Sequence, residues 1–217
     1  MHNLIDVIME NQDYIMQVVM DETGKPIQEA MSMEIYSAID SLAFYAKRAP
    51  KWLKDESRSM HGPMQFLKKT KVAFKPRGVI GVITPWNGPF ILSINPAIQA
   101  VLAGNSVIIK PSEVTPKSGM LVEEMFKKAD APDNLVQVLI GDGQVGADLI
   151  NLKPDKVSFT GSIKTGKLIA RQCGESLIPF SLELGGKDAM IVCDDADIDD
   201  AAKGAVIGSC MNAGQYC

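Results

Sequence analysis

The sequence predicts a doubly wound α/β fold, with a Rossmann-like parallel sheet and flanking helices, from two observations. From residue 78 onward, short apolar runs of strand length alternate with segments of helical periodicity, which is typical of βαβ units. Each run ends in a polar or glycine-containing turn, as expected where parallel strands reach their carboxyl ends. At 217 residues, the chain is long enough to bury one large core.

The residues before the sheet are predicted to form two amphipathic helices and a projecting strand. Apolar side chains recur near helical spacing over 3–20, and again over 27–46 after a break at 23–26. The methionines of the first run could form a binding surface, but core packing is the simpler interpretation. Residues 64–77 are rich in lysine and alternate loosely, like an edge or hairpin strand, and are expected to leave the main body.

The sheet is predicted to contain five strands, with a sixth segment as an additional candidate. The five are 79–84, 106–110, 135–140, 156–160 and 189–193, and the sixth is 180–184. A helix between the second and third strands is marked by Thr115 as N-cap, Pro116 in the first turn, and Lys127 and Lys128 at the end. Ligands of such sheets bind at the carboxyl ends of the strands, so these ends are the candidate site.

Composition and charge argue against several functional classes. The 26 acidic and 22 basic residues give a net charge of -4, and the basic residues are scattered, which argues against a nucleic-acid partner. No apolar run approaches the roughly 18 residues of a membrane span. Two histidines without a cysteine–histidine spacing argue against a metal site. Small molecules are therefore the expected partners.

The cysteines favour a reducing, cytoplasmic location. They lie far apart without a C-x-x-C motif, and the first residues lack the character of a signal sequence. Cys173, Cys193 and Cys210 are interpreted as packing residues.

Two strand ends have features of a nucleotide site. The turn from Gly161 to Gly166 reads G-S-x-x-x-G and leads directly into a helix, whose first N–H groups could hold a phosphate. Because the spacing is not G-x-G-x-x-G, an ordinary glycine-containing helix start is the alternative. Lys110 and Glu113 close another strand and could hold ribose hydroxyls, with a solvated ion pair as the alternative.

Five short motifs stand out together along the chain. They are T-P-W-N at 84–87, K-P-S-E at 110–113, F-T-G-S at 159–162, L-E-L-G-G-K at 182–187 and G-Q-Y-C at 214–217. In order and spacing they resemble the NAD(P)-dependent aldehyde dehydrogenases, and the likeness extends to D-E-T-G-K-P at 21–26 and A-P-D-N at 131–134. The resemblance implies a dinucleotide-binding domain over 1–217. Residues 64–77 would be a bridging or oligomerisation strand, and 215–217 the start of a catalytic domain that is otherwise missing.

The resemblance implies catalytic roles for three residues. Cys217 matches the nucleophile, which attacks the aldehyde to give a thiohemiacetal. Asn87 matches the side chain that donates a hydrogen bond to the resulting oxyanion, although on its own it could be a turn asparagine. Glu183 matches the general base that activates water against the thioester, although on its own it could be an exposed strand carboxylate. No metal is implied.

The resemblance also implies a cofactor, NAD, with NADP left open. It puts Lys110 and Glu113 on the adenosine ribose, Ser162 on the pyrophosphate, Gly143 near the adenine and Trp86 on the nicotinamide side. A carboxylate at position 113 would repel a 2′-phosphate, while Lys110 would partly offset that repulsion. The full cofactor-binding set is Thr84, Pro85, Trp86, Lys110, Ser112, Glu113, Gly143, Gly161, Ser162, Gly166 and Gly185.

The implied activity is oxidation of an aldehyde to a carboxylic acid, by a homo-oligomer that is a dimer or tetramer. About half of the expected polypeptide is absent, including most of the aldehyde pocket. If Cys217 is the terminus, its α-carboxylate disfavours the thiolate, so the isolated chain is expected to be nearly inactive. The alternative is a catalytically silent nucleotide-binding or oligomerising module.

Overall fold

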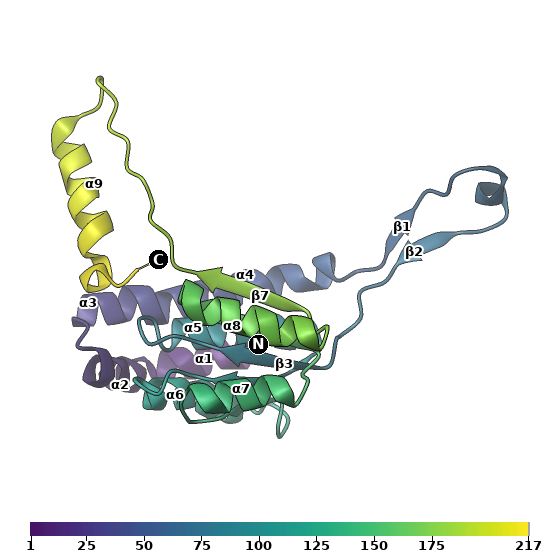
Figure 1. Ribbon diagram of the computed structural model, residues 1–217, viewed down its shortest axis with the longest axis horizontal. Helices are drawn as coiled ribbons and strands as arrows, with labels where there is room; N and C mark the ends of the chain where they lie inside the picture. Colours follow the sequence, from purple (N-terminus) through teal and green to yellow (C-terminus); the bar gives the residue numbers. More distant parts are fainter. Residues whose placement is uncertain (217) are drawn as a thin grey trace.

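The computed structural model describes residues 1–216, and Cys217 lies outside the described residues. Helices flank a parallel sheet, and a hairpin and one helix project from this body (Figure 1). The doubly wound α/β class predicted from the sequence is confirmed.

The sheet is built from five parallel strands. They are β3 (Val79–Ile83), β4 (Ser106–Lys110), β5 (Val136–Val138), β6 (Lys156–Gly161) and β7 (Phe180–Leu184), in the spatial order β5-β4-β3-β6-β7. Ile83 pairs with Lys110, and Thr160 pairs with Glu183. The chain moves outward from β3 to β5 and then returns to the other side of β3. The strand order therefore reverses between β3 and β6, where a ligand crevice is expected at the carboxyl ends.

One predicted strand is wrong. Residues 189–193 lie in an extended loop after β7, while the segment 180–184, expected only as an additional candidate, is the edge strand. Ile191 in this loop is 85% exposed. An apolar run forms a strand only where a neighbour can pair with its backbone, and this one has no paired strand within residues 1–216.

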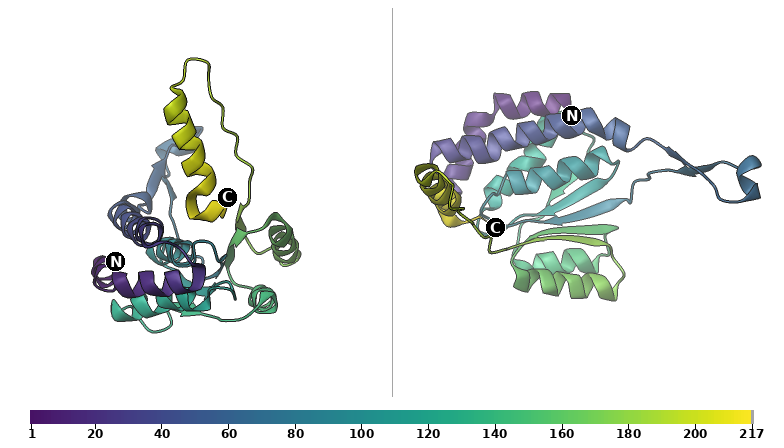
Figure 2. Two further views of the ribbon diagram at one scale, coloured as in Figure 1. Left: turned by 90° about the vertical axis from the view of Figure 1, so that its left-hand side faces the viewer. Right: turned by 90° about the horizontal axis from the view of Figure 1, so that it is seen from above.

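Helices cover both faces of the sheet (Figure 2). On one side, side chains from the N-terminal helices, α5 and α6 form a core with β3, β4 and β5. On the other, α7 and α8 form a second core with Val157 and Phe159 of β6. The elements of the first side are α1 (His2–Glu10), α2 (Gln12–Thr23), α3 (Ile27–Glu29), the π-helix η1 (Ala30–Tyr36), α4 (Ser37–Trp52), α5 (Ile91–Leu102) and α6 (Pro116–Lys128). Those of the second are α7 (Gly143–Asn151) and α8 (Ile163–Glu175).

The predicted core positions of the first helices are mostly buried. Leu4, Ile8, Ile15 and Val19 belong to the first core, whereas Met9 is exposed. The two predicted helical runs are each interrupted in the structure, the first at Asn11 between α1 and α2 and the second by the π-helix.

A hairpin and a C-terminal helix extend beyond the two layers (Figure 1). In the hairpin, β1 (Glu56–Arg58) pairs antiparallel with β2 (Thr70–Val72), and the 3₁₀ helix η2 (Pro63–Phe66) lies between them. The C-terminal part forms α9 (Ile198–Cys210) and the 3₁₀ helix η3 (Met211–Gly214). No helix among the described residues combines the length and apolar character needed to cross a membrane.

The cysteines differ in their surroundings. Cys173 is buried in the second core, and burial raises the pKa of its thiol. Cys193 and Cys210 are exposed, so their interpretation as packing residues is wrong. They lie in the extended loop and in α9, segments that project from the two cores.

Candidate functional site

A cavity of about 290 Å³ lies at the carboxyl edge of the sheet, where the strand order reverses. It is lined by residues from four separate segments: the turn after β3 with the start of α5, the end of β6 with the N-cap of α8, the end of β7, and the chain just before Cys217. Seven predicted site residues line it: Pro85, Trp86, Asn87, Gly161, Ser162, Glu183 and Gly185. Leu92, Thr160, Leu184, Gln215 and Tyr216 complete the lining.

The side chain and backbone of Asn87 are both held by hydrogen bonds. Its side-chain Nδ2 donates to the carbonyl oxygen of Gln215 at 2.7 Å. Its carbonyl oxygen accepts from Lys25 Nζ at 2.7 Å and from Asn212 Nδ2 at 2.8 Å. Asn87 is therefore more than a turn residue, because it connects the N-terminal helices with the segment that leads to Cys217.

The start of α8 offers backbone donors to the cavity. Ser162 is the N-cap, and its Oγ accepts from the N–H of Thr165 at 3.1 Å. A Cβ on Gly166 would lie 2.6 Å from Leu184 Cδ2, so glycine lets α8 approach β7 closely. The remaining first-turn N–H groups and the helix dipole suit an anion.

Lys110, the last residue of β4, forms an ion pair with Glu113 in the turn that follows. Lys110 Nζ lies 2.9 Å from Glu113 Oε2, and the two side chains are 5% and 55% exposed. The pKa of Glu113 lies below its usual value because of a hydrogen bond from its own backbone N–H and a second from Lys110. Glu113 is thus an ionised acceptor that still faces solvent.

The other predicted site residues lie outside this cavity. Thr84 is buried, with Oγ1 2.8 Å from Ser93 Oγ, and Ser112 Oγ accepts from the N–H of Val114 at 3.2 Å. Gly143 begins α7, behind Asp142 as N-cap, and nothing lies within 4 Å of a Cβ added there. Cys217 lies outside the described residues, and among the described ones no cluster of acidic, histidine and cysteine side chains is placed to hold a metal.

Four residues around Asn87 were not anticipated from the sequence: Lys25, Glu29, Glu34 and Asn212. Lys25 and Glu34 form a buried ion pair, and Glu29 Oε1 accepts from the N–H of Asn212 at 3.1 Å. The one available signal was the charge of Glu29 and Glu34 inside a predicted amphipathic helix, whereas Lys25 lies in the turn at 23–26. That signal does not separate a buried charge from a solvated one.

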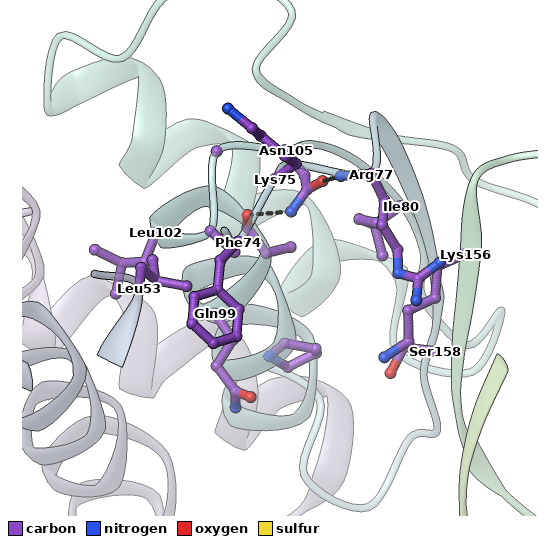
Figure 3. A pocket seen from close by; sticks show the side chains of 14 residues that line it. Leu53, Phe74, Lys75, Arg77, Ile80, Gln99, Leu102, Asn105, Lys156 and Ser158 are labelled. Atoms are coloured by element: carbon purple, nitrogen blue, oxygen red, sulfur yellow. Dashed lines mark hydrogen bonds between the residues drawn. The ribbon is translucent and has the colours of Figure 1, made fainter. Parts of the chain in front are cut away.

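A second cavity, of about 480 Å³, lies at the opposite, amino edge of the sheet (Figure 3). Asn105 links two segments that line this cavity. The Asn105 Oδ1 accepts from the N–H groups of Arg77 and Gly78, and the Asn105 Nδ2 donates to the carbonyl oxygen of Ala100. None of the predicted site residues within 1–216 lines this cavity, so the carboxyl edge is the candidate site.

Comparison with known proteins agrees with this geometry. A family model described as "Aldehyde dehydrogenase family" matches residues 1–217. The chain is 44% identical over 211 residues to 4,4'-diapolycopene aldehyde oxidase of Methylomonas sp, covering 97% of this chain and 40% of that protein. It is 41% identical over 217 residues to a putative succinate-semialdehyde dehydrogenase [NADP(+)] of Mycolicibacterium smegmatis, covering 100% of this chain and 41% of that protein.

Among solved structures, the chain is similar to the NAD+ complex of an aldehyde dehydrogenase from Bacillus cereus. The TM-score is 0.92 at 34% identity, over 99% of this chain and 43% of that one. The chain thus spans well under half the length of the curated relatives it matches.

Proposed function

Because this chain belongs to the aldehyde dehydrogenase family, we propose that the protein oxidises an aldehyde to a carboxylic acid with NAD or NADP. One observation carries the proposal. Asn87, Ser162 and Glu183 line a single cavity with Gln215 and Tyr216, the two residues before Cys217. An oxyanion donor, an anion-binding helix start, a carboxylate base and the nucleophile's own segment thereby meet at the point where α/β sheets bind ligands.

The first chemical step belongs to Cys217 and Asn87. The Cys217 thiolate attacks the aldehyde carbon, a C–S bond forms, and the carbonyl electrons move to the oxygen. The Asn87 amide donates to this oxyanion, and because it is neutral it does not protonate it. Its Nδ2 donates to the Gln215 carbonyl in this structure, so it exchanges that acceptor for the oxyanion during the reaction. When the oxyanion collapses, the carbon–hydrogen bond breaks and a thioester remains; the hydride would pass to NAD(P), which supplies the acceptor when bound.

The second step belongs to Glu183. Its carboxylate takes a proton from water, the resulting hydroxide attacks the thioester, and the C–S bond breaks to release the acid and the thiolate. Glu183 is an exposed residue of β7 that borders the cavity. A carboxylate that water reaches freely suits this role.

The residues at the ends of the strands fit the phosphate and ribose groups of a dinucleotide cofactor. The first turn of α8 behind Ser162 would hold the pyrophosphate, and Lys110 and Glu113 would hold the adenosine ribose. NAD(P), when bound, supplies the hydride acceptor. The ionised Glu113 favours NAD over NADP, although the buried Lys110 would lessen the repulsion of a 2′-phosphate.

Changing Glu113 to Gln tests the ribose contact. We expect NAD to bind about tenfold or more weakly, since a hydrogen bond to a charged acceptor is lost. NADP should lose less affinity, because the variant also removes the repulsion between the carboxylate and the 2′-phosphate. The preference for NAD over NADP should therefore narrow. Titration calorimetry with NAD, NADP and AMP measures both. Because the pKa of Glu113 is lowered, its contribution persists on acidification and disappears only as pH falls through that lowered pKa.

Glu124→Gln is the matched control, since it breaks an exposed ion pair with Lys128 on α6. It should leave all three affinities unchanged. Equal NAD affinity in wild type and Glu113→Gln would contradict the assignment of Glu113 to the ribose. If the wild-type protein gave no heat of binding with millimolar NAD or AMP, the proposed cofactor site would be wrong.

We also propose that the hairpin carries association between copies of the chain, as a homo-oligomer. Phe66 and Leu67 at its end are exposed, and Lys68 and Lys69 follow them. An exposed apolar hairpin end of this kind is typical of an interaction surface.

Replacing Phe66 and Leu67 together by serine should lower the mass measured by light scattering, because apolar area buried between copies is lost. Leu152→Ser with Leu177→Ser is the control, since both leucines are exposed and neither belongs to the hairpin. A wild-type monomer, or an unchanged mass in the hairpin variant, would contradict the assignment.

A further inference from the structure

A buried ion pair lies beneath the turn that carries Asn87. Lys25, in the turn between α2 and α3, donates to Glu34 in the π-helix η1, and the two side chains are 3% and 0% exposed. Burying two charges costs desolvation free energy that their mutual attraction does not reliably recover, so such a pair is weak evidence for stability. Its other hydrogen bonds indicate what it does.

Those other bonds all go to one segment, residues 87–91. Lys25 Nζ donates to the carbonyl oxygen of Asn87 at 2.7 Å. Glu34 Oε2 accepts from the N–H groups of Phe90 and Ile91, at 3.1 Å and 2.8 Å. The pair therefore contacts both ends of the turn after β3. The Lys25 ammonium binds a carbonyl oxygen at one end, and the Glu34 carboxylate binds two backbone N–H groups at the other.

Glu34 also takes the place of a local cap for α5. Phe90 occupies the N-cap position, where it cannot supply a side-chain acceptor, and Ile91 is the first helical residue. A carboxylate at a helix N-terminus satisfies its free N–H groups and complements its dipole. Glu34 reaches this position from a π-helix, a conformation retained frequently at functional sites.

The same carbonyl of Asn87 is the point where the other side of the site is attached. It accepts from Asn212 Nδ2, and Asn212 is buried with a positive φ of 53°. The Asn87 amide in turn donates to the carbonyl oxygen of Gln215, two residues before Cys217. The orientation of Asn87 relative to the Cys217 segment thus depends on a carbonyl that Lys25 holds in place.

We infer that Lys25 and Glu34 are positioning residues that aim the Asn87 amide at the oxyanion. The inference rests on the proposed function and extends it to two residues that do not line the cavity of about 290 Å³. Removing either charge frees one end of the 87–91 turn, so the amide departs from the geometry in which it stabilises the oxyanion. Displacements of about 1 Å in such groups cost about 100-fold in rate.

The test measures the burst of NADH in a single turnover, using the complete protein that the gene encodes. We expect Glu34→Gln to slow the burst about 10- to 100-fold. The Kd for NAD and the rate at which iodoacetamide alkylates Cys217 should each stay within about twofold of wild type, because the ribose contacts and the thiol are untouched. A general loss of structure would move all three measurements together.

Glu22→Gln is the matched control. Glu22 is also a carboxylate that caps a distant helix, accepting from the N–H groups of Lys117 and Ser118 at the start of α6. It makes no bond to the 87–91 turn within residues 1–216. The burst rate at saturating NAD should therefore be unchanged in this variant.

A double-mutant cycle with Asn87→Ala separates positioning from simple destabilisation. If Glu34 acts through Asn87, Glu34→Gln slows the burst far less in the Asn87→Ala background than in wild type. Equal fold-losses in both backgrounds, a wild-type burst rate in Glu34→Gln, or the same loss in Glu22→Gln would overturn the inference.

A second variant covers the case in which one unpaired buried charge prevents folding. Lys25→Met with Glu34→Leu removes both charges together, which is often neutral for stability. We expect this variant to fold and to show the same slow burst, and a wild-type burst rate would refute the inference. A wild-type protein with no burst would refute the proposed function and the inference with it, whereas a normal wild-type burst retained in the variants refutes the inference alone.

Discussion

Replacing Cys217 by alanine is expected to abolish the burst of NADH in a single turnover of the complete protein. Without the sulfur, no thiohemiacetal forms, so neither hydride release nor the thioester follows. Removal of the attacking nucleophile of a serine protease lowers turnover by about 10⁶-fold, and a comparable loss here would leave a rate indistinguishable from background. Stopped-flow absorbance with a panel of aliphatic and aromatic aldehydes measures it.

Cys193→Ala and Cys210→Ala are the matched controls, since both thiols are exposed and reach solvent as readily as a reactive cysteine must. Each should keep a full burst. Iodoacetamide should label Cys217 first and end activity in proportion to labelling. A full burst in Cys217→Ala, or activity lost on labelling of Cys193 or Cys210 instead, would refute the nucleophile assignment.

Replacing Glu183 by glutamine should allow the reaction to reach the thioester but slow its hydrolysis. The first attack and the hydride release do not need this carboxylate, so a burst of one equivalent per site survives. Hydrolysis loses its base, and steady turnover should fall by about 10²- to 10⁴-fold. The thioester then accumulates, and mass spectrometry of the quenched protein should find the acyl group on Cys217.

Glu175→Gln, which alters an exposed carboxylate at the far end of α8, should leave both phases unchanged. If Glu183→Gln lost burst and steady rate to the same extent, Glu183 would act before or during hydride release. Undiminished turnover would show that another group activates the water.

The sequence predicted the sheet well where strands have neighbours on both sides. The apolar runs at 79–84, 106–110 and 156–160 match β3, β4 and β6, which lie inside the sheet. At the edges the result was mixed, since the additional candidate 180–184 matches the edge strand β7 while two other predicted strands do not hold. The run 135–140 is reduced to the three residues of β5, and 189–193 is not a strand. Whether an apolar segment forms a strand depends on a neighbouring strand that can pair with it, and the local sequence pattern does not identify that neighbour.

Helix N-caps also differ in whether the sequence predicts them or only the packed fold reveals them. Ser162 was expected to start a helix, and its own Oγ makes the capping bond three residues along. Thr115 occupies the expected N-cap position before α6, but its Oγ1 is buried without a partner among the described residues. Glu22 of α2 supplies the acceptor there instead. A cap within one turn can be predicted from spacing, whereas a cap from a distant helix requires the packed fold.

The sequence by itself determined the fold class and the strand-end motifs, because these depend on periodicity and on residues close together along the chain. Only the tertiary structure decided which motifs meet in one cavity, and that Lys25 and Glu34 lie under Asn87, 62 residues from Lys25. A charged residue in an amphipathic helix, such as Glu34, or in a turn, such as Lys25, has the same local pattern whether it is solvated or buried. Its partners are chosen by helix packing, which brings the Asn87 carbonyl and the Phe90 and Ile91 amides to the one place where both charges are satisfied.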